Sequence, residues 1–265
     1  GDLRGRAAAQ HAVRARKDCC TAGHPVLAPV PAASSEPPHG PDQPDPAVFR
    51  GPAATESPDV TVWYGTNRVP GDDRELYTAE PDDELHVGRC VVTVPTSVPV
   101  GQMRSRRSRG RTEPTRYVIA QHEALHDLAS LRDELDAAQV GSRSVLVYVH
   151  GYRTRFTEAI TRAAQLHSDL RHPGRMAVFA WPSRGNPDGY WADEDAVQHA
   201  ERYLLQFLIM LHRDVRPERI DVLAHSMGNR AMLRAAMRIA DGTPDSDGLS
   251  LGNVILAAAD VGRRF

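Results

Sequence analysis

The sequence predicts an α/β fold in which helices cover both faces of a mostly parallel, doubly wound sheet. Short apolar runs alternate with segments of helical periodicity from residue 59 onward. Several of these runs are apolar throughout, including 144–149 (SVLVYV) and 176–181 (MAVFAW). Strands that are buried on both faces have this composition, and parallel strands need crossover connections, which are usually helical. The alternation therefore favours a sheet built from βαβ units.

Composition indicates where the folded region begins. Hydrophobic residues make up 41% of the 265-residue chain and charged residues 25%, which are ordinary values for a globular domain. Residues 21–58 hold ten of the 20 prolines, with little apolar surface between them. Such a segment cannot bury enough surface to fold. We therefore expect a disordered Pro-rich segment over residues 1–58 and one α/β domain over residues 59–265.

Charge, apolar runs and cysteines argue against several classes of function. The net charge of -2 and pI near 6.7 give no electrostatic footprint for nucleic acid. No apolar run approaches the ~20 residues that cross a bilayer, and we expect no signal peptide, so the cytoplasm is the favoured compartment. Cys19, Cys20 and Cys90 form neither a disulfide framework nor a zinc pattern. We expect no metal and no organic cofactor.

The expected elements follow from periodicity and from turn residues. Leu128, Leu131 and Leu135 recur at helical spacing, for example, and Thr157 is the expected N-cap of the second helix. Residues 65–68 (GTNR) are expected to form the turn that leaves the first strand. The predicted strands are 60–64, 87–94, 117–120, 144–149, 176–181, 220–224 and 253–259, and the predicted helices are 128–138, 157–170, 195–212 and 229–240.

The most informative segment is Ala224-His225-Ser226-Met227-Gly228, which lies between a predicted strand and a predicted helix. It resembles the nucleophile elbow G-x-S-x-G, in which a serine sits on a sharp strand-to-helix turn. Small residues are needed two positions before and after that serine, and here they are Ala224 and Gly228. The pattern predicts Ser226 as a nucleophile. The backbone N–H of Met227 would stabilise the oxyanion, assisted by the helix N-terminus.

A second motif follows the strand 144–149 and reads His150-Gly151-Tyr152. A hydrolase with a nucleophile elbow takes its second oxyanion donor from a loop after an earlier strand, often marked by His-Gly. The donor would be the backbone N–H of Tyr152. We expect Gly151 to allow the close approach and His150 to orient the loop, while His225 supports the site beside the nucleophile. Trp181-Pro182-Ser183 is expected to end a strand without direct chemistry.

Five segments of the chain resemble, in order, a bacterial family of α/β-hydrolases of unknown function. They are VHGY, AWPS, a helix starting near residues 190–193 (YWAD), LAHSMGNR and NVILAAADV, and the earlier VWYGTNR (62–68) resembles the opening strand of that family. The resemblance covers roughly residues 60–261. It implies the α/β-hydrolase fold and a serine nucleophile at Ser226. The family usually has Pro-Asp where this chain has Ala259-Asp260, and it has no settled substrate.

The catalytic histidine is the missing part of the predicted site. The triad order in this fold is serine, acid, histidine, whereas all 12 histidines lie at or before His225. The resemblance implies two further strands, so we expect a C-terminally truncated domain, with the histidine beyond residue 265. Asp260 is the candidate acid, and a loop-ordering carboxylate is the alternative. No positional argument makes a base of the upstream histidines His122, His126, His199, His212 or His225.

These observations lead to three hypotheses of function. The first is a serine hydrolase of carboxylic esters, thioesters or lipid acyl groups, inert or weakly active as this chain. The second is a non-catalytic binding or scaffold protein that retains the fold. The third is a membrane-surface lipase or acyltransferase in which the arginine run 104–111 contacts anionic headgroups. We also expect the apolar edge strand 254–258 to make the chain poorly soluble. The oligomeric state stays open.

Overall fold

The computed structural model describes residues 59–72, 74–95, 100, 117–138, 143–242 and 248–261. These residues all belong to one compact unit, Pro52–Phe265. The predicted disordered segment 1–58, the arginine run 104–111, and Cys19 and Cys20 lie outside the described residues. Cys90 is buried in the core, and this burial raises the pKa of its thiol to about 12.

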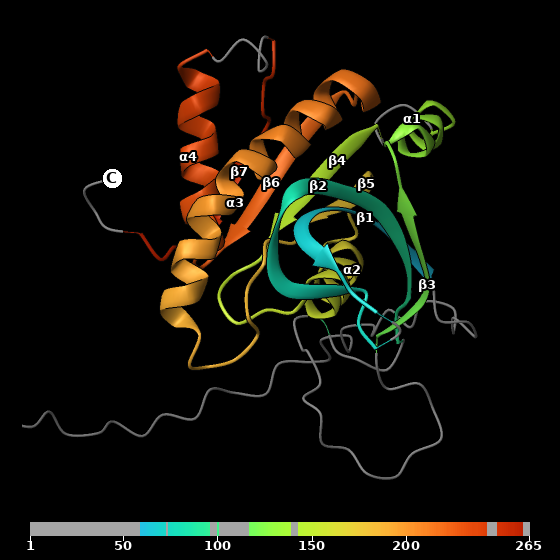
Figure 1. The fold of residues 1–265 in the computed structure, drawn as a ribbon. Helices are drawn as coiled ribbons and strands as arrows, with labels where there is room; N and C mark the ends of the chain where they lie inside the picture. The colour runs from blue at the N-terminus through green and yellow to red at the C-terminus, as the bar shows by residue number, and fades with distance from the viewer. Residues whose placement is uncertain are drawn as a thin grey trace, which may run out of the picture. The chain divides into compact units, whose positions relative to one another are not determined.

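A seven-stranded sheet in the order β3-β2-β1-β5-β4-β6-β7 forms the centre of the described chain (Figure 1). β1 pairs antiparallel with β2 and β2 pairs antiparallel with β3, whereas β1·β5, β4·β5, β4·β6 and β6·β7 are parallel. The mostly parallel sheet confirms the predicted fold class. The strands are β1 (Asp59–Pro70), β2 (Tyr77–Thr93), β3 (Val118–Leu125), β4 (Ser144–Val149), β5 (Arg175–Phe179), β6 (Arg219–His225) and β7 (Val254–Ala257).

Helices cover both faces of the sheet and create two separate cores (Figure 1). Helix α2 (Phe156–Leu170) packs on one face. The other face carries α1 (Ala129–Asp136), α3 (Tyr190–Met210) with its π-helical extension η1 (Leu211–Val215), and α4 (Gly228–Ala240). Neighbouring side chains on a strand point to opposite faces, so Trp63 packs in the core under α3 and Tyr64 in the core under α2.

The antiparallel part of the sheet is longer than predicted. The expected turn at residues 65–68 is wrong, because these residues belong to β1, which pairs with β2 from Asp59↔Thr93 to Pro70↔Tyr77. Irregular register after Thr66 and again after Arg68 marks bulges that bend this hairpin. Charged residues fill the first half of β2, so its periodicity is obscured in the sequence. β3 also continues past residue 120 and includes His122.

Two helix starts differ from the prediction. Helix α2 begins at Phe156 with Arg155 as N-cap, so Thr157 is not the cap. The Glu158 carboxylate accepts a hydrogen bond from the Arg155 backbone N–H (2.9 Å), as in the reciprocal capping motif. Helix α3 begins at Tyr190, five residues before the start that periodicity predicted and within the residues 190–193 that the resemblance implied. The other bounds from residue 128 onward agree with the prediction within about two residues.

Strand β7 lies at the edge of the sheet beside β6. The exposed fractions of its apolar side chains are 39% for Val254, 49% for Ile255 and 40% for Leu256. An exposed apolar edge of this kind is a pairing hazard, so poor solubility stays a prediction. In the part of the chain that the structure describes, no helix has the length and apolar character needed to cross a bilayer.

Candidate active site

Ser226 lies on a tight turn between β6, which ends at His225, and α4, which begins at Gly228. Its φ angle is 51°, a left-handed conformation that is costly for a residue with a side chain. The turn is held from two sides. The Ser226 backbone N–H donates to the carbonyl of Ala257 in β7 (2.9 Å), and its carbonyl accepts from the side-chain amide of Asn229 in α4 (2.7 Å).

The residues two positions before and after Ser226 are small, and the end of strand β4 comes close to the second of them. A Cβ atom at Gly228 would lie 2.3 Å from the carbonyl oxygen of His150 and 2.9 Å from that of Val149. Both contacts are backbone, so a larger residue would push the elbow away from β4. Ala224 is fully buried and pairs with Val149 on one side and Leu256 on the other. The spacing of small residues in the motif thus has a steric cause at Gly228.

The His-Gly loop lies directly against the elbow. A Cβ atom at Gly151 would lie 2.9 Å from the Cβ of Ser226 and 2.8 Å from Nδ1 of His225. The loop and turn hydrogen bonds of the described residues include none donated by the backbone N–H of Tyr152 or Met227. The loop that carries Tyr152 touches the turn that carries Met227. The two N–H groups expected to bind an oxyanion thus belong to segments that are in contact beside Ser226.

His150 is a buried structural residue beneath this loop. Its Nδ1 lies 2.9 Å from the carbonyl oxygen of Gly151 and its Nε2 lies 3.1 Å from that of Trp181. The ring stacks on Trp181, whose indole N–H donates to the His150 carbonyl (2.7 Å). Burial, assisted by the positive charge of Arg68, lowers the pKa of His150 to about 3. A neutral ring donates to only one of the two carbonyls, and it has no contact with Ser226 that would make it a base.

Tyr152 is oriented by contacts on both sides of its ring. The ring packs edge-to-face on Tyr190, with centroids 5.3 Å apart. Its hydroxyl donates to the carbonyl oxygen of Pro187 (2.5 Å), and the carbonyl oxygen of Asn186 lies 3.2 Å from the same hydroxyl. These contacts fix the residue whose backbone N–H is the candidate second oxyanion donor.

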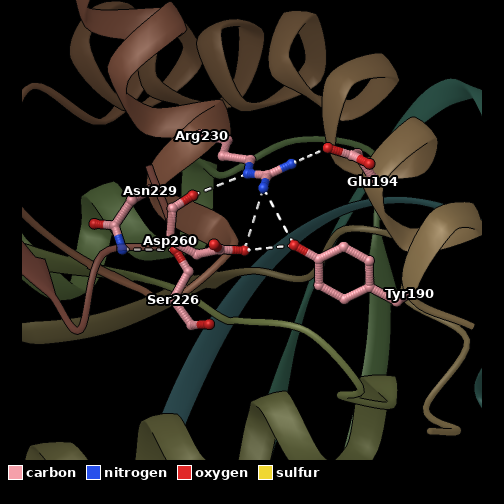
Figure 2. A network of polar contacts seen from close by, with 6 residues as sticks. All are labelled: Tyr190, Glu194, Ser226, Asn229, Arg230 and Asp260. Atoms are coloured by element: carbon pink, nitrogen blue, oxygen red, sulfur yellow. Dashed lines mark hydrogen bonds and ion pairs between the residues drawn. The ribbon is translucent and has the colours of Figure 1, made fainter. Parts of the chain in front are cut away.

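Asp260 lies beside the elbow in a network of polar side chains (Figure 2). Its backbone N–H donates to the Ser226 carbonyl (3.3 Å). Its carboxylate accepts from the Tyr190 hydroxyl (3.0 Å) and from Arg230 (3.3 Å), and Arg230 also pairs with Glu194. Figure 2 shows the Ser226 hydroxyl pointing away from this carboxylate. The candidate acid is thus near the nucleophile, but its side chain contacts α3 and α4.

The described histidines do not reach the Ser226 hydroxyl through a hydrogen bond. His122 Nε2 bonds to the Tyr64 hydroxyl (2.9 Å), and His199 lies 3.7 Å from the Asp83 carboxylate. His225 precedes the nucleophile in sequence, and partial burial, followed by the charge of Arg162, lowers the pKa of its ring. In the residues that the structure describes, no group of three or more His, Cys, Asp or Glu side chains is placed to hold a metal ion.

A groove of about 530 Å³ runs along α2 on the face opposite α3 and α4. Its walls span residues 158 to 169 of α2, which corresponds to about 16 Å of helix. Thr154 of the His-Gly loop and His225 also line it, so the groove reaches the neighbourhood of the elbow. The other lining residues are Tyr148, Glu158, Arg162, Leu166, Asp169, Leu223 and Ala257.

Several residues that shape the site were not singled out from the sequence. Asn229 and Arg230 hold the elbow and the segment after β7, and a buried group consisting of Arg68, Ser183 and Asp193 lies under the His-Gly loop. Each lies in a segment that carried the family resemblance: YGTNR, AWPS, YWAD or SMGNR. Their position inside segments that resemble the family was therefore the feature of the sequence that could have identified them.

A comparison with known families identifies the family to which the chain belongs. No curated protein and no solved structure matches the chain. A family model described as "Alpha/beta hydrolase of unknown function" (DUF900) matches residues 127–264, which is just over half of the chain. The match includes the His-Gly loop, the elbow and Asp260, whereas β1, β2 and β3 precede it. The chain therefore belongs to this family of α/β-hydrolases of unknown function.

Proposed function

We propose that this protein is a serine hydrolase that cleaves carboxylic esters, thioesters or lipid acyl groups, with Ser226 as its nucleophile. Membership of an α/β-hydrolase family supports hydrolase chemistry in general. The observation that carries the proposal is the left-handed Ser226 (φ 51°) with Gly151 packed against it. A serine on an ordinary strand-to-helix turn needs neither the strained angle nor the adjoining His-Gly loop.

The proposed reaction proceeds through an acyl-enzyme. Ser226 Oγ attacks the acyl carbon, and the carbonyl oxygen becomes a tetrahedral oxyanion. The backbone N–H groups of Tyr152 and Met227 donate to that oxyanion, and the N-terminus of α4 adds a favourable field. Collapse of the intermediate expels the alcohol or thiol and leaves the acyl group on the serine. Water then attacks the ester, releases the acid and restores the hydroxyl.

The proton of the Ser226 hydroxyl needs a general base, because a neutral hydroxyl is a poor nucleophile. The described contacts assign no histidine to that role. Asp260 is the proposed acid, since it follows the strand after the elbow and its backbone contacts Ser226. Its carboxylate contacts the Tyr190 hydroxyl and the Arg230 guanidinium.

The absence of a base among the described contacts favours a second candidate, a non-catalytic binding protein that retains the fold. The two candidates differ in what Ser226 does. A hydrolase needs its hydroxyl, whereas a binding protein needs only the surface around it. Removal of a single oxygen atom at residue 226 therefore separates them.

The test is turnover of p-nitrophenyl esters of increasing acyl length, and of the matching thioesters, by the full-length gene product. We expect Ser226→Ala to abolish turnover, down to the residual rate that an oxyanion hole alone supports. Ser168→Ala is the matched control, because this serine lies in α2 and donates only to its own helix at Ala164 (3.1 Å). Folded wild-type protein without Ser226-dependent turnover would favour the binding role.

A further inference from the structure

Three polar residues from distant parts of the chain meet in the interior under the His-Gly loop. Arg68 comes from β1, Ser183 from the segment after β5, and Asp193 from the first turn of α3. Their exposed fractions are 1%, 0% and 0%. Ionised side chains are rarely buried this completely unless they are paired and hydrogen-bonded. We call this group the Arg68–Ser183–Asp193 cluster.

The cluster holds the loop through three backbone groups of two successive residues, Arg153 and Thr154. The Asp193 carboxylate accepts from the Arg153 N–H (3.2 Å), and the Ser183 hydroxyl accepts from the Thr154 N–H (2.9 Å). Arg68 donates through Nη2 to the Thr154 carbonyl (2.9 Å). The Ser183 hydroxyl in turn donates to Asp193, which joins the members into one network.

The loop needs such support because it is not held by regular structure. Arg153 has a φ of 57°, which is unfavourable for a residue with a side chain, and its own side chain is exposed. The contacts that keep this conformation must therefore act on the backbone. Arg153 directly follows Tyr152, so the peptide that carries the Arg153 N–H begins at the Tyr152 carbonyl, one residue away from the Tyr152 N–H.

Charge balance keeps the members of the cluster dependent on one another. Arg68 donates to the carbonyl oxygens of Ala180 (3.2 Å) and Ser183 (3.2 Å) as well as to the loop. Burial lowers the pKa of Arg68 to about 9, and the carboxylate of Asp193 opposes that shift. The guanidinium thus stays charged at neutral pH. Neutralising Asp193 would remove the largest of the three carboxylate charges that stabilise the buried guanidinium, the other two being Glu75 and Glu158.

We propose that the Arg68–Ser183–Asp193 cluster is a positioning device that fixes Tyr152–Thr154 so that the Tyr152 N–H faces the oxyanion formed at Ser226. Asp193 is its central member, because it holds Arg153 directly and Thr154 through Ser183. This inference rests on the proposed function for its catalytic meaning. The positioning of the loop itself can be measured without turnover.

The test compares Asp193→Asn with a matched buried aspartate. Asparagine keeps the shape of Asp193 but has a single acceptor oxygen, whereas Asp193 accepts from both Arg153 and Arg184 (2.7 Å). Asp221→Asn is the control. Asp221 is 6% exposed and also accepts from a backbone N–H, at Asn253 (2.7 Å), but it lies mid-strand in β6, outside the loop and the elbow.

The first measurement is amide hydrogen exchange by NMR in both variants and in the wild type. We expect at least tenfold faster exchange at Arg153 and Thr154 in Asp193→Asn, and wild-type exchange at both amides in Asp221→Asn. Unchanged protection of these two amides in Asp193→Asn would overturn the proposal. If Asp193→Asn does not fold, Ser183→Ala is the substitute variant. We expect it to lose protection from exchange at the Thr154 amide alone.

The second measurement is the split between kcat and KM for the ester that the wild type turns over best. Loss of one oxyanion donor costs on the order of 10²–10³ in kcat. We expect a fall of that size in Asp193→Asn with KM within about threefold, and wild-type kcat in Asp221→Asn. Unchanged kcat in Asp193→Asn would overturn the catalytic part. A wild type without Ser226-dependent turnover would overturn the proposed function, and amide exchange would still decide whether the cluster holds the loop.

Discussion

Acidification tests the description of His150 as a neutral, fully buried ring. In the folded chain burial lowers the pKa of His150 from 6.5 to about 3, whereas in the unfolded chain the ring is in water. The unfolded chain therefore binds the proton more tightly between these two values. The sign follows directly: the free energy of unfolding falls as the pH drops below about 6.5 and stops falling through this group below about 3.

The magnitude follows from the two pKa values. Each pH unit inside the window costs about 1.4 kcal/mol. Between pH 7 and pH 5 the unfolded ring becomes mostly protonated while the folded ring stays neutral. Integration over that interval gives a loss of about 2 kcal/mol in the free energy of unfolding from His150 alone. That loss is a large share of the stability of an ordinary domain.

The assay is urea unfolding at pH 7, 6 and 5 for the wild type and for His150→Gln, whose amide does not titrate. Other acid-sensitive groups act equally in both proteins, so the difference between them isolates His150. We expect the stability advantage of the wild type to shrink by about 2 kcal/mol from pH 7 to pH 5. His126→Gln is the control, since that ring is exposed. A constant difference would refute the reasoning. A growing one would mean that the ring is charged and donates to both Gly151 and Trp181.

Three other changes have defined outcomes. Asn229→Ala removes the amide that donates to the carbonyls of Ser226 (2.7 Å) and Ala257 (3.2 Å). The free energy of unfolding, measured with a chemical denaturant, should fall by about 1–3 kcal/mol, and turnover should slow. Asp260→Asn should lower kcat by on the order of 10²-fold or more if Asp260 is the acid. If Asp260→Asn instead lowers the thermal stability and leaves kcat unchanged, the role of Asp260 is to order the loop. Ile255→Lys places a charge on the edge strand at a side chain that is 49% exposed, and it should reduce aggregation measured by light scattering. Unchanged aggregation would show that this edge does not cause it.

The parallel half of the fold was predictable because its signals are local. β4 and β6 are buried runs bounded by turn residues, and the elbow shows its small residues in the sequence itself. The antiparallel half was not, because β2 mixes charges on an open face with an irregular register against β1. Its first half therefore lacks a clean period of two.

Within the candidate site, the sequence indicated the residues of the two short motifs beside Ser226. It did not indicate the residues that hold these motifs in place from elsewhere in the chain. Ser226 and Gly228 belong to one short motif and Gly151 to another, so each could be picked out from its local sequence, and the structure brings Gly151 against Ser226. Asp193 contacts the loop across 40 residues of sequence. Hydrophobic periodicity does not encode a contact of that separation, so the one signal for Asp193 was its place in the segment YWAD, which carries the family resemblance.

The arrangement at Ser226 can be tested directly by locating a covalent adduct. A fluorophosphonate probe reacts when a serine oxygen displaces fluoride from phosphorus, which mimics acyl transfer. Peptide mass spectrometry on the full-length gene product would then identify the modified residue. We predict a single adduct on Ser226, its disappearance in Ser226→Ala and its retention in Ser168→Ala. Folded protein that carries no adduct, or carries it on another serine, would contradict the assignment of Ser226 as the nucleophile.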